Sequence, residues 1–217
     1  MTPLFLLLLG VWACFPVWAT KFEMKDLAQR NLVAINSDAT YERTLAVSHF
    51  VSGWVEVNPD NLETFNAEFE MDVRTLDTGL ELKNIQLRDQ LLSSQEFPIA
   101  KAVCQGSYSG QKLKLLDAKA ITLKSDCTFK IKNVQKTFPI SFKMTYFKES
   151  EESRQRLTGN LMKISANWDL ELSQFSISIP SKYSALIAKT MQVSIDMVGT
   201  DRLPNNALSL PEGIKKK

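Results

Sequence analysis

Histidine is nearly absent from this chain of 217 residues, and the common active-site motifs are missing. With a single histidine, His49, a metal site of several histidines is excluded, and any Ser-His-Asp triad would depend on that residue. The sequence also lacks Gly-x-Ser-x-Gly, a phosphate-binding loop and Cys-x-x-Cys. We interpret His49 as a surface or hydrogen-bonded histidine, and we expect no catalytic residue, metal or cofactor.

An excess of charge of one sign is also missing. Lys and Arg number 26 against 24 Asp and Glu, which gives a formal net charge of +2, and the two signs are interspersed. No basic stripe indicates a nucleic-acid partner. We interpret the acidic group Glu149, Glu151 and Glu152 as part of a solvated loop, and the basic run 215–217 as a solvated tail.

Hydrophobic runs long enough to span a membrane, about 20 residues, are missing as well. A shorter apolar run starts at Leu4, and Val17 and Ala19 follow it at the −3 and −1 spacing of a signal peptidase site. We expect residues 1–19 to be a signal peptide cleaved near Ala19, and the protein to be periplasmic or secreted. Lipoprotein anchoring at Cys14 is the minor alternative.

The remaining chain has the length of one domain with a core of its own. We assign residues 20–200 to this domain. Residues 201–217, which include two prolines and a glycine, are expected to form an irregular C-terminal tail.

Apolar residues recur with period two through most of this domain, which is typical of half-buried antiparallel strands. The clearest runs are 65–73, 121–131, 138–146, 164–172 and 191–197. Turn signals separate them, and many strands joined by short turns predict a sandwich or a closed barrel. Only the segment from Leu80 to Leu92 has helical spacing, so we expect a short helical insert there.

The inward positions of these runs hold many flexible or aromatic apolar residues, and two interpretations of them stay open. An eight-stranded barrel can be packed solid or can hold one small ligand, so the strand count does not decide. Met and Phe adapt to irregular alkyl shapes, which favours a cavity only slightly. The candidates for cavity lining are Phe65, Phe69, Met71, Phe129, Phe142, Met144, Trp168 and Met191.

Two cysteines, Cys104 and Cys127, remain after the predicted cleavage. Counting from Pro98, Cys104 shares the inward register of its strand, and Cys127 shares that of Leu123 and Phe129, so both sulfur atoms should face the same side. We therefore predict a disulfide, which an exported protein allows. The alternative is a pair of buried thiols that act as small hydrophobic side chains.

The run from Asp72 to Val103 resembles the signature of the YceI family. In that family a strand ends in a Ser/Thr-x-Asp-Thr-Gly turn, a short helix follows, and a Phe-Pro or Tyr-Pro leads into the next strand. The matching residues are Leu76, Asp77, Thr78, Gly79, Leu82, Asn84, Leu87, Leu92, Phe97 and Pro98. Weaker matches at 52–59, 133–136 and 168–177 extend the resemblance from about Asn31 to Gly199.

Three positions depart from the family pattern: Lys83 replaces an Arg, Gln86 a His, and Ser176 a Gly. If the family His polarises a ligand headgroup, Gln86 can still donate and accept a hydrogen bond but cannot change its charge near neutral pH. Gln86 is therefore a further candidate for ligand binding, with an altered headgroup preference or pH response.

The resemblance implies a lipocalin-like eight-stranded antiparallel β-barrel that binds isoprenoid quinones or similar amphiphiles. We expect an exported binding protein, not an enzyme, that holds a polyisoprenoid or isoprenoid-quinone-like lipid for sequestration or transport, with no nucleic-acid partner and no integral membrane span. Two alternatives stay open. One is a lipid-modifying enzyme with a reactive pair near Gln86 or His49, and the other is a packed barrel that serves as an interaction module without a ligand.

Overall fold

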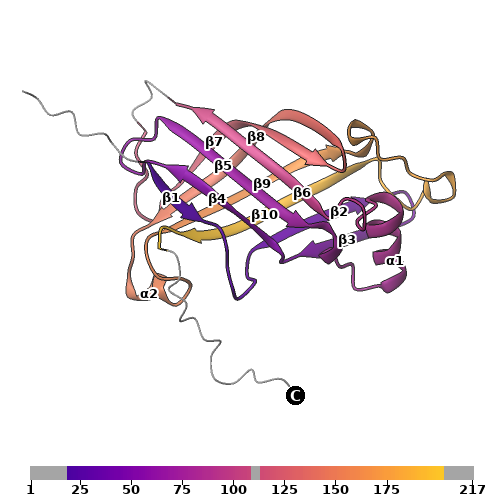
Figure 1. Ribbon diagram of the computed structural model, residues 1–217, viewed down its shortest axis with the longest axis horizontal. Coiled ribbons are helices and arrows are strands. Elements are labelled where there is room, and N and C mark those ends of the chain that lie inside the picture. The colour runs from indigo at the N-terminus through magenta and orange to yellow at the C-terminus, as the bar shows by residue number, and fades with distance from the viewer. Residues whose placement is uncertain (1–18, 109–112, 203–217) are drawn as a thin grey trace, which may run out of the picture.

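The computed structural model describes residues 19–108 and 113–202, which form one antiparallel β-sheet that closes on itself (Figure 1). The strands are β1 (Thr20–Glu23), β2 (Leu32–Asp38), β3 (Arg43–Ser48), β4 (Val51–Val57), β5 (Thr64–Asp72), β6 (Ile99–Ser107), β7 (Ala120–Ile131), β8 (Val134–Phe147), β9 (Leu161–Glu171) and β10 (Thr190–Thr200). The helical segments are η1 (Val73–Thr75), α1 (Glu81–Ile85), η2 (Gln86–Leu91), α2 (Glu151–Arg154), η3 (Leu172–Phe175) and η4 (Ser181–Tyr183).

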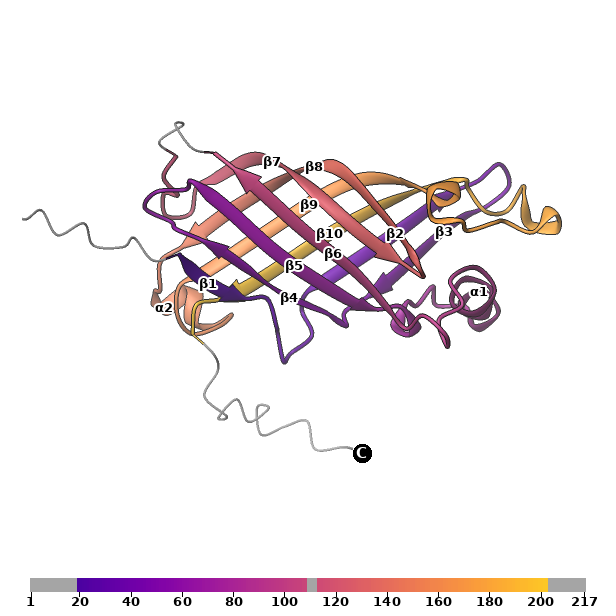
Figure 2. The same ribbon diagram turned by 45° about the horizontal axis from the view of Figure 1, so that its top comes forward.

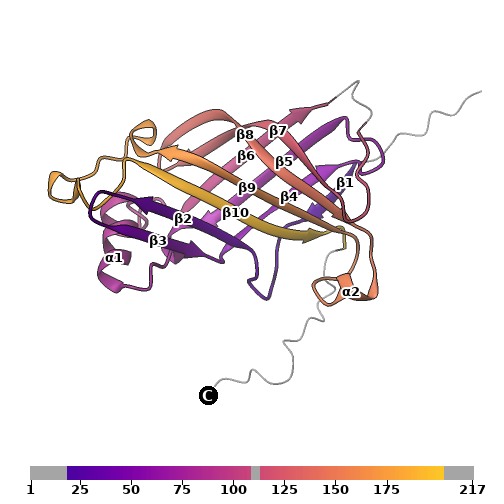
Figure 3. The same ribbon diagram turned by 180° about the vertical axis from the view of Figure 1, so that it is seen from behind.

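Eight strands close the barrel, and two of them are interrupted. β1 pairs with β4 and reaches β10 where Glu23 lies opposite Thr200. β2 pairs with β3 and lies along the same edge of β10, so β1 and β2 act as one broken strand and β3 and β4 as the next. Figure 3 shows β2 and β3 beside β10 on the back of the barrel. The predicted lipocalin-like eight-stranded antiparallel barrel is confirmed.

The period-two alternation of the sequence matches burial along the strands. In β9, for example, Ile164, Ala166 and Leu170 are buried, whereas Asn167 and Asp169 between them are exposed. Successive side chains of a strand point to opposite faces of the sheet, so one face fills the barrel. Burying each large apolar side chain contributes roughly 1.5–3 kcal/mol, which makes this interior the main source of stability.

The predicted helical insert is present as α1 followed directly by η2, a turn of π-helix, and it lies at one end of the barrel (Figure 2). A turn before it is held by Asn84, which is buried. The Asn84 amide donates to Asp77 Oδ1 (2.8 Å) and its oxygen accepts from the Thr78 backbone N–H (2.8 Å). Gly79 adopts φ +77°, a conformation that glycine adopts without strain. These contacts fix the helix across the barrel end.

The segment between β9 and β10 projects from this same end (Figure 2). It is tied to the β2–β3 hairpin, because Ala185 O accepts from the Tyr41 backbone N–H (3.2 Å) and Ser37 Oγ accepts from the Ala188 N–H (3.0 Å). Ser176 in this segment has φ +56°, the left-handed region, which explains why glycine suits the position.

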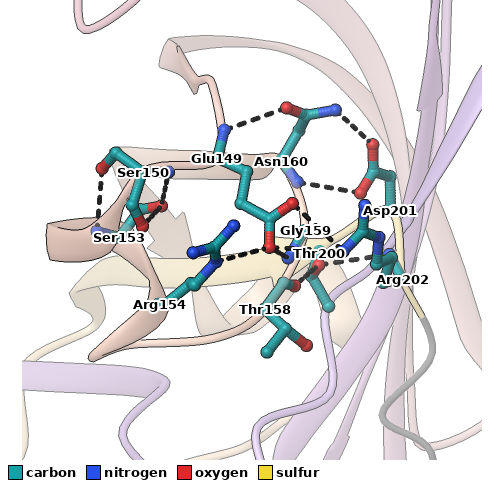
Figure 4. Close-up of polar contacts among 10 residues, drawn as sticks. All are labelled: Glu149, Ser150, Ser153, Arg154, Thr158, Gly159, Asn160, Thr200, Asp201 and Arg202. Carbon is teal, nitrogen blue, oxygen red and sulfur yellow. Dashed lines mark hydrogen bonds and ion pairs between the residues drawn. The ribbon is translucent and has the colours of Figure 1, made fainter.

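A polar network fixes the opposite end of the barrel (Figure 4). Glu149 accepts hydrogen bonds from Arg154 Nε (3.0 Å) and the Gly159 backbone N–H (3.2 Å), and the bond from Arg154 lowers the pKa of Glu149. Asp201, just after β10, accepts from the backbone and side-chain N–H groups of Asn160 at 2.9 and 2.7 Å. The expectation of a solvated loop is wrong for Glu149, whose side chain is only 16% exposed because these donors enclose it.

A second network lies where the first strand breaks between β1 and β2. The Asp26 side chain is 1% exposed and contacts Arg30 Nε at 2.8 Å and Arg156 at 2.9 Å. Burial alone would raise the pKa of Asp26, but the hydrogen bonds from Arg30 and the Ala28 N–H and the charge of Arg156 bring it below its ordinary value. The carboxylate therefore stays charged and joins the strand break to the loop after α2.

Replacing Asp26 with Asn is expected to lower the free energy of unfolding at pH 7 by about 3 kcal/mol, since two arginines lose their counter-charge. The pKa of Asp26 is lowered on folding, so its contribution is complete above the ordinary value of 3.8 and is lost as the pH falls through the lower folded value. Urea titrations at several pH values should show the wild-type advantage shrinking below about pH 4.

Asp60→Asn is the matched control for this experiment. Asp60 is 81% exposed and its partner Lys114 is 57% exposed, so solvent screens the pair. We expect this variant to follow the wild type closely at neutral pH. An Asp26→Asn variant as stable as the wild type at pH 7 would contradict the proposed role of the buried carboxylate.

The predicted disulfide between Cys104 and Cys127 is present in the structure. The two residues lie directly opposite each other on β6 and β7, with α-carbons 4.1 Å apart, and both are buried. The inward register inferred from the sequence is therefore correct for both cysteines.

Residues 1–18 of the predicted signal peptide and most of the predicted C-terminal tail lie outside the described residues. Cys14 and the residue Val17 that defines the cleavage site are among them. Within the two described stretches, no helix is long and apolar enough to cross a membrane.

Candidate ligand-binding site

An apolar cavity of about 130 Å³ lies inside the half of the barrel nearest α1. Inward side chains of β2, β4 to β7, β9 and β10 form its wall, and Leu87, Leu91 and Leu92 close it from the helical insert. A single water needs roughly 10–15 Å³ of such space, so this cavity has room for a substantial part of an alkyl chain.

The wall of this cavity carries almost no polar side chains. Glu70 and Lys101 are the charged residues along it. Lys101 Nζ lies 3.4 Å from Glu70 Oε1, and the side chains of Glu70 and Lys101 are 47% and 34% exposed. Both alternate with inward residues on their strands, so these side chains lie on the outer face. The interior surface is therefore apolar, which favours a hydrocarbon chain over a polar ligand.

Five of the predicted lining residues meet in this cavity. They are Phe69, Met71, Phe129, Trp168 and Met191. The rings of Phe129 and Trp168 lie 5.3 Å apart, and Phe129 also stacks on Phe138 at 4.7 Å. Phe69, Phe129 and Trp168 are the lining residues of β5, β7 and β9 that lie farthest from the helical insert. They form the floor of the cavity.

The structure places the other three predicted barrel residues below this floor. Phe65, Phe142 and Met144 are buried but line neither this cavity nor the smaller one beside it. Phe65 and Phe142 pack against each other with ring centroids 4.8 Å apart. One half of the barrel is thus filled and the other half is hollow, so the two interpretations of the inward register each apply to one half.

Small side chains on β6 explain why the space is open. The inward positions of this strand are Ala100, Ala102 and Cys104, whereas β5 beside it carries Phe69 and Met71 at the same level. A wall of small residues leaves volume that the facing side chains do not fill. The sequence shows this run of small residues, but its position opposite large ones becomes visible only in the folded barrel.

Gln86 lies in a second, smaller cavity of about 40 Å³. This space adjoins the larger cavity, because Ile35, Leu87, Leu91 and Met191 line both. It is more polar: Ser37, Thr44, Lys83 and Tyr183 contribute to its wall beside Gln86. The Lys83 ammonium forms an ion pair with Glu42 on the β2–β3 hairpin. The second cavity is therefore a partly polar space between the helical insert and the segment that follows β9.

Trp168 carries one polar atom that the barrel does not satisfy. Its indole Nε1–H is buried and has no hydrogen-bond partner among residues 19–108 and 113–202, where it is the one such side-chain nitrogen or oxygen. Leaving a buried donor unpaired costs about 1–3 kcal/mol.

His49 lies outside the barrel interior. It is exposed, and its Nδ1 is 3.0 Å from the Asn31 carbonyl oxygen, to which the ring N–H donates. It lines neither interior cavity. The interpretation of His49 as a hydrogen-bonded surface histidine agrees with this position.

Comparison with known proteins agrees with the geometry. Residues 31–199 match the YceI-like domain. The chain belongs to the YceI-like family. No curated protein matches it. The resemblance noted at the turn and helix of residues 72–103 is thereby confirmed over most of the barrel.

Solved structures share the YceI-like fold. A polyisoprenoid binding domain from Saccharophagus degradans, implicated in plant cell wall breakdown, aligns with a TM-score of 0.62 at 12% identity over 84% of this chain and 98% of that one. BcnA from Burkholderia cenocepacia aligns with a TM-score of 0.60 at 17% identity, over 81% and 99%. The YceI protein of Campylobacter jejuni aligns with a TM-score of 0.53 at 12% identity, over 70% of this chain and 82% of that one. At identities this low, the structural alignments establish a common fold and nothing further.

Proposed function

We propose that this YceI-like protein binds a long-chain amphiphile, a polyisoprenoid or an isoprenoid-quinone-like lipid, and holds its apolar chain inside the barrel. The observation that carries the proposal is the apolar cavity between the floor residues and the helical insert. The similar fold of a polyisoprenoid binding domain supports the ligand class. The role is sequestration or transport of the lipid.

The driving force is removal of the ligand chain from water. Each methylene buried in an apolar cavity contributes roughly 0.8 kcal/mol, so several of them outweigh a single net hydrogen bond of about 1 kcal/mol. Met71, Met191 and Met197 line the cavity, and flexible thioether side chains adjust to chains of different shape. The length of the chain should therefore govern affinity more than the headgroup does.

The same cavity supports binding without chemical turnover. Its inward side chains are aliphatic or aromatic, and none is a serine, cysteine, histidine or aspartate. Covalent catalysis needs a nucleophile with a base within hydrogen-bond reach. A bound chain in this cavity meets no such pair, so we propose that the lipid leaves unchanged.

Export completes the proposal. The N-terminal run with Val17 and Ala19 supports a cleaved signal peptide, and the buried disulfide is of the kind that oxidising compartments allow. An exported carrier of this kind would protect a water-insoluble lipid outside the cytoplasm.

Affinity is expected to rise with chain length across geraniol, farnesol and geranylgeraniol, by roughly 0.8 kcal/mol for each further methylene that enters the cavity. Competition with a fluorescent fatty-acid probe measures the affinities, and chromatography of the extracted alcohols checks that they are unchanged. Affinities independent of chain length would refute burial of the chain. Conversion of the alcohols that His49→Ala abolishes would instead support the enzyme alternative.

A further inference from the structure

The wall of the barrel is split on one side of the cavity. Residues 142–147 of β8 pair with residues 161–166 of β9, but the pairing stops there, although β8 extends back to Val134 and β9 runs on to Glu171. Over these further stretches, β8 stays paired with β7 and β9 stays paired with β10. The two strands therefore separate in the half of the barrel that holds the cavity, and β8 contributes no side chain to the cavity lining.

Pro139 provides a physical reason for this separation. It lies in the stretch of β8 that β9 does not pair with, and proline has no backbone N–H to donate to a neighbouring strand. Within sheets, proline is accordingly confined mainly to edge strands, strand starts and bulges. The sequence of β8 thus makes residues 134–141 an edge, although the strand belongs to a closed barrel.

Residues 172–177, which we call the strap, close this split. They comprise η3, which lies against β8, and the two residues that follow it. Leu172 and Ile177 line the cavity where a side chain of β8 would otherwise be expected. Phe175 is only 1% exposed and belongs to the hydrophobic core, but it lines neither cavity. Phe175 therefore anchors the strap without contributing to the space for the ligand.

Apolar packing alone holds the strap to β8. In the described part of the chain, no hydrogen bond joins the strap to residues 134–141. The Ile177 N–H donates to the Leu172 carbonyl within the strap (3.1 Å), and the Leu172 N–H donates to Lys189 O (3.0 Å). Segments with few hydrogen bonds to their surroundings open at a lower free energy than paired strands do. The strap is thus the part of the cavity wall that can open while the sheet stays paired.

We propose that the lipid enters and leaves the cavity sideways, through the split between β8 and β9, and that the strap is the gate of this opening. This inference rests on the proposed function and specifies how its site is loaded. A chain that passes Leu172 and Ile177 reaches the cavity directly, and its headgroup stays in water outside the wall. No polar group then has to cross the apolar interior, which would be costly. The alternative route leads through the barrel end, past the helical insert that Asn84 fixes.

The kinetics of ligand exchange test the route. Phe175→Ala removes the anchor of the strap, and loading and release both pass through the open form. The rate constants for association and dissociation of the fluorescent fatty-acid probe should each rise about tenfold, while the Kd changes by less than about threefold. Stopped-flow fluorescence of the full-length chain, with geranylgeraniol as the competitor that displaces the probe, measures both rate constants.

Asn84→Ala and Phe22→Ala are the matched controls. Asn84→Ala loosens the helical insert and so tests the alternative route. Phe22 is fully buried, packs against Tyr146 with ring centroids 6.2 Å apart, and lines neither cavity, so Phe22→Ala tests general loosening of the barrel. Both controls should keep the rate constants within about twofold of the wild type. Melting curves check each fold, and the milder pair Phe175→Leu and Phe22→Leu should show the same contrast at smaller size if an alanine variant unfolds.

Hydrogen exchange tests the strap in the wild type, without any substitution. The Ile177 N–H should exchange at least about tenfold faster than the N–H groups of the β9–β10 ladder. If it exchanges as slowly as the ladder, the strap does not open by itself and the proposed gate is overturned.

The outcomes separate the gate from the function on which it rests. Faster exchange of the probe in Phe175→Ala alone supports the gate. Equal acceleration in either control, or acceleration in Asn84→Ala alone, would overturn the gate and leave lipid binding in place. Failure of the wild type to bind the probe and geranylgeraniol would overturn the proposed function and the gate together.

Discussion

Replacing Ala100 with Phe is expected to weaken binding of geranylgeraniol by about 100-fold. Ala100 lines the cavity from β6, so the new ring occupies the space that the ligand chain needs. Excluding about four methylenes, at roughly 0.8 kcal/mol each, removes about 3 kcal/mol of binding free energy. The same competition assay that ranks the alcohols by chain length measures the loss.

Val103→Phe provides the control on the same strand. Val103 lies three residues further along β6 and pairs in register with Glu68 and Thr128, in the row of side chains that faces outward. The Val103→Phe variant should bind geranylgeraniol with the affinity of the wild type. Overpacking can cost 1–3 kcal/mol of stability, so melting curves accompany both variants. A folded Ala100→Phe variant with wild-type affinity would place the ligand elsewhere.

Removing the disulfide is expected to lower the free energy of unfolding by about 3 kcal/mol. Cys104 and Cys127 are 23 residues apart, and a cross-link that closes a loop of this size restricts the unfolded chain by about that amount. The double variant Cys104→Ala and Cys127→Ala, compared with the oxidised wild type in urea, measures the change.

Two controls accompany the disulfide measurement. The wild type under reductant should lose most of the same free energy without any change of side-chain size. The intact mass of the unreduced, denatured, alkylated protein should show neither cysteine modified. If both thiols are alkylated, or if the double variant is as stable as the oxidised protein, the cross-link does not stabilise the barrel.

Much of this fold could be predicted from the sequence, because period-two alternation alone specifies which residues face inward. The runs in β5 and in β7 to β10 gave the correct register, and the register placed Cys104 and Cys127 on the same face. The interrupted strands were harder to predict. Asp26 and Asn31 interrupt the alternation between β1 and β2. Their polar side chains are explained only by the folded structure, in which Asp26 pairs with Arg156 and Asn31 Oδ1 accepts a hydrogen bond from the Val198 N–H.

The candidate site could be predicted only in part. Phe69 and Phe65 share a strand, a face and a residue type, yet one lines the cavity and the other packs against Phe142. The difference depends on the residues at the same level of the barrel, such as Ala102 beside Phe69, and these come from other strands. Volume is a property of a whole layer of the barrel, so a strand read alone does not reveal it.

The pairing of β10 with β1 and β2 also has a consequence for how the chain acquires its cavity. The hairpins from β4 to β10 join neighbours in sequence, whereas closure joins Glu23 to Thr200 across almost the whole described chain. Contacts between residues this far apart in the sequence have the largest entropic cost of loop closure and tend to form late in folding. Val193 and Ile195 of β10 pair with Ile35 and Val33 of β2 across this seam, and all four residues line the cavity, so the cavity wall is complete only once the seam has closed.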